Sequence, residues 1–142
     1  MLLRHRHPPG IRRRSGLLAG LCWLAGSHVV AGSPLHQAMR RAEELGDEAV
    51  RAGDRPYGAV VLLGDVIAGA APSRVVTTTG PTAHAEMEAI RDAARRLRTR
   101  DLSGCVLVST SRPCGMCEAA AAGVGISRMV YGESLTEAGA LR

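Results

Sequence analysis

The chain has 142 residues, which is enough for one domain with a modest hydrophobic core. Hydrophobic residues make up 46 % of it, but aromatic residues only 2 %, and Phe is absent, so the core must be built from small aliphatic side chains. Five of the 18 basic residues precede position 35, which leaves 13 basic and 13 acidic residues in 35–142. A formally neutral domain argues against a protein that works mainly through a basic, nucleic-acid-binding surface.

Residues 1–34 are basic and then apolar, and we expect them to form an N-terminal extension outside the fold. They resemble a signal peptide with a cleavage site after Ala31, and the arginines at 12–14 are typical of a twin-arginine signal. The alternative is an over-extended start, with the protein beginning near Val29 or Val30. We favour the alternative and a cytoplasmic location, because the paired thiols described below suit a reducing compartment. The apolar run is too short for a membrane anchor.

The first element of the fold is an amphipathic helix. Ser33-Pro34 predicts its start, because serine is a good cap and proline fits the first turn. Apolar residues then recur at spacings of three and four up to Ala49, which gives the helix one buried stripe. Gly53-Asp54 predicts its end.

A β-hairpin follows, with strands at residues 57–63 and 66–70 joined by the two-residue turn Gly64-Asp65. Residues 72–80 form a loop that leads directly into the motif described below. Such a loop would border the site, so its polar residues are candidate substrate contacts: Ser73, Arg74, Thr77, Thr78 and Thr79.

The second half alternates helices and strands. We expect helices at residues 84–98 and 114–122, and strands at residues 105–109 and 126–132. Because a helix separates the last two strands, they should be parallel with a right-handed crossover. The expected architecture is therefore an α/β fold with a mixed sheet of about four strands.

Two distant motifs carry the chemistry: PTAHAEME, which contains His84 and Glu86, and SRPCGMC, which contains Cys114 and Cys117. One imidazole and two thiols are the ligands of a catalytic zinc, which keeps its fourth position open. The pattern H-x-E…P-C-x-x-C is the signature of the zinc nucleobase deaminases, in which the glutamate is not a ligand and acts as general acid and base. We therefore predict Zn²⁺ at His84, Cys114 and Cys117, with Glu86 as the proton shuttle.

The spacing of the residues within each motif can be explained if each motif lies at the start of a helix. We expect Pro113 in the first turn of a helix that places both sulfurs on one face, and Thr82 as the cap of the helix that carries the histidine. Residues two apart point in nearly opposite directions on a helix, so His84 and Glu86 can serve one pocket only from an irregular helix start. A closed structural zinc site or a redox C-x-x-C are the alternatives, but neither needs the HAE triplet, and Cys105 is expected to be a buried thiol.

With these motifs in place, the chain resembles the cytidine deaminase-like superfamily. The stretches PYGAVVL, PTAHAEMEAI, PCGMC and GISRMVYGES are most similar to the branch of guanine deaminases, yeast-type cytosine deaminases and bacterial tRNA adenosine deaminases, over about residues 35–138. The resemblance implies a zinc-dependent deaminase domain at 35–142 with a three-layer α/β/α fold, and a homodimer. It also implies that the backbone amide of Ala85 contacts the substrate.

The chain departs from the family pattern at three places. Family members that act on guanine or tRNA carry an asparagine eleven residues before the zinc histidine, where this chain has Ser73. Arg112 stands before the Pro-Cys pair; it could meet a substrate phosphate or carboxylate, but we expect it to reach solvent. The chain also ends at Arg142, so the C-terminal strand and helix of the family are expected to be missing.

Three functions follow from these observations. We favour deamination of a small nucleobase or nucleoside of the cytosine, guanine or adenine type, because the domain is neutral. A tRNA-specific adenosine deaminase is the second hypothesis, and it needs a basic surface. A truncated, non-catalytic zinc-binding module is the third, although such a module has no use for Glu86.

Overall fold

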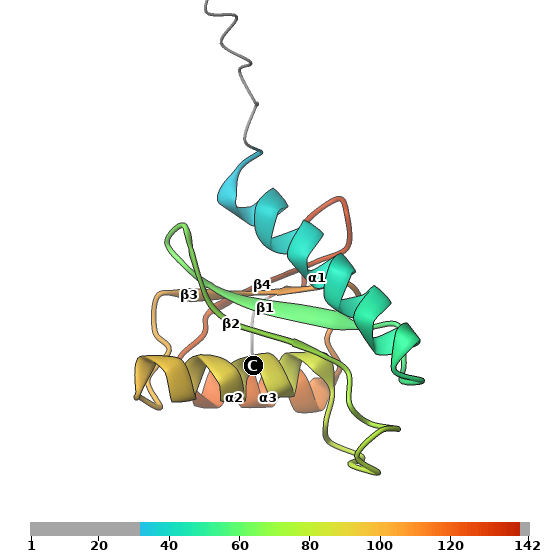
Figure 1. Ribbon diagram of the computed structural model, residues 1–142. Helices are drawn as coiled ribbons and strands as arrows, with labels where there is room; N and C mark the ends of the chain where they lie inside the picture. Colours follow the sequence, from blue (N-terminus) through green and yellow to red (C-terminus); the bar gives the residue numbers. More distant parts are fainter. Residues whose placement is uncertain (1–31, 140–142) are drawn as a thin grey trace, which may run out of the picture.

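The computed structural model describes residues 32–139, and its elements form three layers (Figure 1). A five-stranded mixed sheet lies in the middle, with α1 on one face and α2 and α3 on the other. This confirms the expected α/β/α architecture. Apart from residues 32–34, the expected N-terminal extension lies outside the described residues.

Helix α1 spans Pro34–Arg51 and begins as its sequence predicts. The Ser33 side chain accepts a hydrogen bond from the backbone N–H of His36 at 3.4 Å, and proline occupies the first turn. The described fold therefore begins at this cap, two residues before the expected boundary at 35. The buried stripe of the helix consists of small and medium side chains: Ala38, Met39, Ala42, Leu45 and Ala49.

Strands β1 (Gly58–Leu63) and β2 (Val66–Pro72) form the expected hairpin. Gly64 lies in the turn with a φ of 62°, a conformation that favours glycine. Strand β2 continues two residues beyond the expected end, so the loop before the site is shorter than the sequence indicated.

The strand order is β2-β1-β3-β4-β5. Strands β3 (Cys105–Ser109) and β4 (Arg128–Tyr131) are parallel, as expected for strands joined through a helix. The sheet has one strand more than the sequence predicted, because β5 (Thr136–Glu137) turns back and pairs antiparallel with β4. Two residues are too few to show a strand pattern.

Two hydrophobic cores pack on the two faces of the sheet. Side chains of β1 alternate between them: Ala59 and Val61 face α2 and α3, whereas Val60 and Leu62 face α1. Alanine dominates the helix surfaces that cover the sheet, so helices and strands approach closely. A Cβ at Gly58 would overlap the carbonyl oxygen of Ala42 in α1.

Helices α2 (Ala85–Leu97) and α3 (Gly115–Gly123) cover the same face of the sheet, and their first turns lie next to each other. This arrangement brings residues from two distant parts of the sequence to one place. Among residues 32–139 there is no helix whose length and apolar character would let it cross a membrane.

Candidate active site and metal centre

His84 occupies the N-cap position of α2, with extended backbone angles of φ −63° and ψ 152°. Glu86 lies two residues later, inside the first turn, so the irregular helix start lets both side chains serve one pocket. The expectation that Thr82 caps this helix is wrong, because the cap is the histidine itself. Its side chain makes no capping hydrogen bond, which leaves the imidazole available for other contacts.

Cys114 occupies the N-cap position of α3, and Cys117 lies in its first turn. Pro113 precedes the cap and lies two residues before the first helical residue, Gly115, so the expectation that this proline lies in the first turn is wrong. The main prediction still holds, since both sulfurs lie at the start of one helix. The helix N-terminus carries partial positive charge and unpaired N–H groups, which favours negative charge on the sulfurs.

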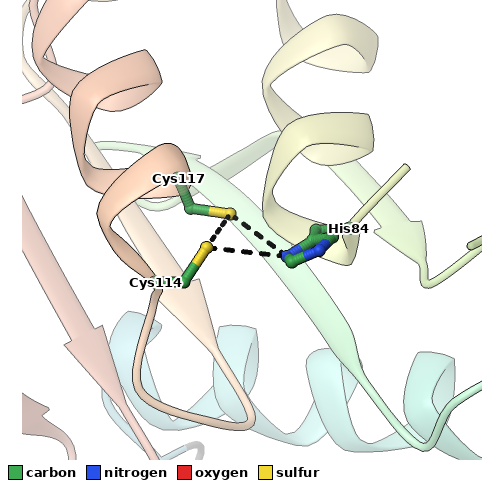
Figure 2. A group of neighbouring side chains, drawn as sticks. All are labelled: His84, Cys114 and Cys117. Atoms are coloured by element: carbon green, nitrogen blue, oxygen red, sulfur yellow. Dashed lines mark hydrogen bonds between the residues drawn. The ribbon is translucent and has the colours of Figure 1, made fainter. Parts of the chain in front are cut away.

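The two thiols and the imidazole point toward one another (Figure 2). The Nδ1 atom of His84 lies 3.7 Å from Sγ of Cys114 and 3.7 Å from Sγ of Cys117, and the two sulfurs are 3.7 Å apart. This separation excludes a disulfide, and both cysteines are free.

The spacing of these three atoms fits a zinc ion. With tetrahedral angles and usual bond lengths, zinc would hold two sulfurs about 3.8 Å apart and each sulfur about 3.5 Å from the nitrogen. Within residues 32–139, His84, Cys114 and Cys117 are the one group of at least three potential ligands this close together. Three protein ligands leave the fourth position of a tetrahedral metal open, as catalytic zinc sites require.

The surroundings of Cys117 disfavour a thiolate when no cation is bound. Burial raises the pKa of its thiol far above the ordinary value, and the neighbouring Glu86 carboxylate and Cys114 raise it further. A thiolate at this position therefore needs a positive charge beside it. A divalent metal on the three ligands supplies that charge.

Glu86 is buried, with 5 % of its surface exposed, and its Oε1 atom accepts a hydrogen bond of 2.9 Å from the hydroxyl of Ser109. Ser109 is the last residue of β3 and is fully buried. The hydrogen bond fixes one carboxylate oxygen.

A cavity of about 240 Å³ opens beside the metal centre. Its walls come from four segments: the chain before β1, the end of β2 with the loop after it, the start of α2, and the chain before α3. The lining residues are Arg55, Tyr57, Ser73, Val75, His84, Ala85, Glu86, Ser111, Arg112 and Cys114. Both expected substrate-contact positions, Ser73 and Ala85, are among them.

The hydroxyl of Ser73 donates a hydrogen bond of 2.8 Å to Oδ1 of Asp54. The same carboxylate accepts four more hydrogen bonds, from the backbone N–H groups of Arg55, Val76 and Thr77 and from the Thr77 hydroxyl. Although partial burial alone would raise the pKa of Asp54, these hydrogen bonds lower it well below the ordinary value. Asp54 thus ties the end of α1 to the loop that borders the cavity.

Sequence reasoning named the three residues that the structure brings together as a possible metal site, but it missed other residues around the cavity. Ser109 gave one signal, as a small polar residue that ends an apolar strand. Tyr57 and Ser111 lie within the stretches PYGAVVL and SRPCGMC, but nothing in these stretches assigned them a role, and Arg55 lies outside every motif. Of the loop residues expected to contact substrate, Ser73 lines the cavity, whereas Arg74 and Thr77–Thr79 do not. Val75, which was not among the expected residues, also lines it.

Residues 33–133 match the family model described as the cytidine and deoxycytidylate deaminase zinc-binding region. The chain belongs to this family. The match covers the whole described fold except the last strand, and it includes His84, Glu86 and both site cysteines. The resemblance seen in the sequence motifs is thereby confirmed.

Relatives with curated functions fall into three groups. The chain is 42 % identical over 123 residues to a tRNA(Ile)-lysidine synthase from Deinococcus deserti, which covers 84 % of this chain and 23 % of the relative. It is 38 % identical to the tRNA-specific adenosine deaminase of Aquifex aeolicus, over 68 % of this chain and 62 % of that one. It is 40 % identical to the guanine deaminase of Bacillus subtilis, over 56 % of this chain and 51 % of that one. The chain therefore spans less than two thirds of each of these relatives.

Solved structures agree with these matches. A structure described as that of a tRNA:A34 deaminase superposes with a TM-score of 0.64 and 33 % identity, over 67 % of this chain and 73 % of that one. The X-ray structure of the Bacillus subtilis guanine deaminase gives a TM-score of 0.64 and 35 % identity, over 68 % and 62 % of the two chains. Both are deaminases, so the family and the donor set together identify Zn²⁺ as the metal for this site.

Proposed function

We propose that the chain is a zinc-dependent hydrolytic deaminase that converts an amino group on a nucleobase or nucleoside to a carbonyl and releases ammonia. One observation carries the proposal. A buried carboxylate that belongs to no ligand set, Glu86, shares a cavity with His84 and Cys114 and is held in place by Ser109. A purely structural metal site has no use for such a carboxylate.

The metal would be held by Nδ1 of His84 and the Sγ atoms of Cys114 and Cys117. When bound, zinc supplies Lewis-acid activation of water at near-neutral pH. The two cysteines, ionised in that state, balance the formal charge of the metal. The α3 N-terminus supports their negative charge through its N–H groups.

Glu86 moves the protons in this proposal. Its other oxygen takes a proton from the attacking water and gives it to the ring nitrogen beside the carbon that carries the amino group. A second transfer moves the remaining proton of the added hydroxyl to the amino nitrogen, which then leaves as ammonia while the carbonyl forms. The hydrogen bond from Ser109 keeps the carboxylate in one orientation through both transfers.

Ala85 and Ser73 bind the substrate in this proposal. The N–H of Ala85 belongs to the first residue of α2, where backbone donors have no partner within the helix, so it can donate to the base. Ser73 gives its hydroxyl hydrogen to Asp54, so its oxygen offers the cavity a hydrogen-bond acceptor.

A tRNA-specific adenosine deaminase is the second candidate, and the similarity to such enzymes favours it. Charge favours a small substrate, because residues 32–139 contain 12 arginines and 13 acidic residues and thus no excess of positive charge.

A non-catalytic zinc-binding module is the third candidate, and the buried Glu86 counts against it. We also propose a cytoplasmic location, since the thiol ligands suit a reducing compartment, and a homodimer, which the resemblance to the family implies.

The test is ammonia release by the full-length, zinc-loaded chain. The panel contains cytosine, guanine and adenine, their nucleosides and 5′-monophosphates, and unmodified tRNA. Release from any small molecule identifies the substrate and supports the proposal, whereas release from tRNA alone supports the second candidate. A chain with one bound zinc that releases ammonia from no member of the panel contradicts both, and the non-catalytic alternative then stands.

A further inference from the structure

Two arginine residues line the cavity beside the metal centre. Arg55 comes from the segment between α1 and β1, and Arg112 from the segment between β3 and α3. Both residues are exposed, and both line the cavity. The sequence alone suggested that Arg112 would reach solvent, and the structure places it at the cavity as well.

Neither arginine is neutralised by a carboxylate. Five of the 12 arginines in residues 32–139 form ion pairs, on α1, α2 and β4, and neither Arg55 nor Arg112 is among them. The acid nearest to Arg55 in the sequence is Asp54, whose oxygens already accept five hydrogen bonds. Among the described residues, Glu86 is the one acidic residue that lines the cavity, and it is buried and bonded to Ser109. The cavity is therefore lined by two arginines that form no ion pair within residues 32–139.

An aromatic residue also lines the cavity. Tyr57 lines the cavity two residues after Arg55, and 39 % of its surface is exposed. Aromatic residues make up only 2 % of the chain, so a tyrosine at this position is notable. Aromatic side chains can stack on the flat face of any nucleobase.

We propose that Arg55 and Arg112 bind a phosphate group of the substrate, so that the cavity takes a nucleotide unit in preference to a free base or a nucleoside. A guanidinium matches phosphate oxygens with two parallel N–H···O bonds, and an unpaired arginine needs no prior ion pair to be broken. The base lies against Tyr57 with its amino group toward Glu86. This inference rests on the proposed function and specifies that the nucleoside carries a phosphate.

The phosphate can come from a free nucleoside monophosphate or from a polynucleotide backbone. The first test is calorimetric binding to the full-length, zinc-loaded Glu86→Gln variant, which separates binding from turnover. The ligands are cytidine, adenosine and guanosine, their 5′-monophosphates, and an RNA stem-loop with an unpaired seven-nucleotide loop. We expect at least one monophosphate, or the RNA, to bind at least about tenfold more tightly than its nucleoside.

The arginines are then replaced in the same background. Arg55→Ala and Arg112→Ala should each reduce the advantage of the phosphorylated ligand and leave nucleoside binding unchanged, while Arg112→Lys should keep part of it. Arg40→Ala is the matched control, because Arg40 is an exposed arginine on α1, across the sheet from the metal site. Inorganic phosphate should compete with the monophosphate, and the advantage should shrink as salt increases.

Equal binding of nucleosides and their phosphorylated forms, including no binding by either, overturns the inference. An advantage that survives both alanine substitutions also overturns it. Neither result depends on ammonia release, so the inference can fail while the deaminase proposal stands. Conversely, an inactive chain that binds monophosphates through both arginines leaves the phosphate site intact.

Discussion

The hydroxyl of Ser109, at the end of β3, donates a hydrogen bond of 2.9 Å to Oε1 of Glu86, in the first turn of α2. Both residues are buried, so water does not compete for the bond. A strand and a helix thereby hold one carboxylate next to the metal centre from two directions. Glu86 needs this support, because a free carboxylate in a buried site could turn away from the cavity.

Replacing Glu86 with glutamine tests its role as proton carrier. The amide oxygen of Glu86→Gln can still accept from Ser109, and the side-chain volume is unchanged, but the amide cannot take a proton from water. Turnover should fall by about 10²–10⁴-fold, the usual contribution of general acid–base catalysis, while zinc content stays the same. Ammonia release and metal analysis on the same sample measure both.

Glu88→Gln is the matched control for this substitution. Glu88 lies two residues after Glu86 in the same helix and forms an ion pair with Arg91. Ion pairs near the surface contribute little to stability. The loss of this ion pair should leave turnover unchanged. A fully active Glu86→Gln variant, or equal losses in the two variants, would disprove the assignment.

Cys117→Ser tests the ligand set. A hydroxyl is a poor zinc ligand compared with a thiolate, so we expect the variant to bind much less than one zinc per chain. Cys105→Ala is the control, because Cys105 is also a buried free thiol but lies in β3, outside the metal centre. Zinc content measured by atomic absorption should fall in the first variant only; unchanged zinc in Cys117→Ser would exclude this residue as a ligand.

Asp54 makes stability depend on acidity. Hydrogen bonds hold the pKa of the Asp54 carboxylate below its ordinary value in the folded chain. As the pH falls, Asp54 is therefore protonated in the unfolded chain before it is protonated in the folded chain. Its contribution to the free energy of unfolding is present above about pH 4 and is lost as the pH falls below that value. Asp54→Asn should therefore lower stability at neutral pH and weaken the loss of stability on acidification.

Urea unfolding between about pH 6 and pH 2.5 measures this dependence across the range in which carboxylates titrate. Asp65→Asn is the control: within residues 32–139, this turn residue makes no side-chain hydrogen bond, so its substitution should leave the pH dependence as it is. If Asp54→Asn and the wild type lose stability in parallel on acidification, the five hydrogen bonds do not control the pKa of Asp54.

Gly58→Ala tests the close contact between α1 and β1. The added methyl group would overlap the carbonyl oxygen of Ala42 and crowd Leu45, so the helix must shift. We expect a loss of about 1–3 kcal/mol in the free energy of unfolding, the usual cost of overpacking. Gly123→Ala is the control, because a methyl group there meets no atom within 4 Å; a loss of equal size in both variants would contradict the packing argument.

The sequence predicted most of the fold because its signals are local. The apolar stripe of α1, the glycine turn between β1 and β2, and the crossover between β3 and β4 each follow from spacing within a short segment. The metal centre was also predictable, since His84, Cys114 and Cys117 are marked by two motifs.

Other features depend on contacts between distant segments, and these gave no local signal. Strand β5 consists of two residues that pair with β4, and its side chains are exposed, so no pattern of burial reveals it. Four of the five hydrogen bonds to Asp54 come from residues about 20 positions away in the sequence. Arg55 and Arg112 are far apart in the sequence, and only the fold brings both of them to the lining of one cavity.

The most direct test of the account is a zinc titration of the metal-free, full-length chain, with ammonia release measured at each step on the best substrate of the panel. We predict no activity without metal and a rise that levels off at one zinc per chain, since His84, Cys114 and Cys117 form one site. Full activity in the metal-free chain would contradict the account. So would a chain that binds one zinc and releases ammonia from no nucleobase, nucleoside, nucleotide or RNA.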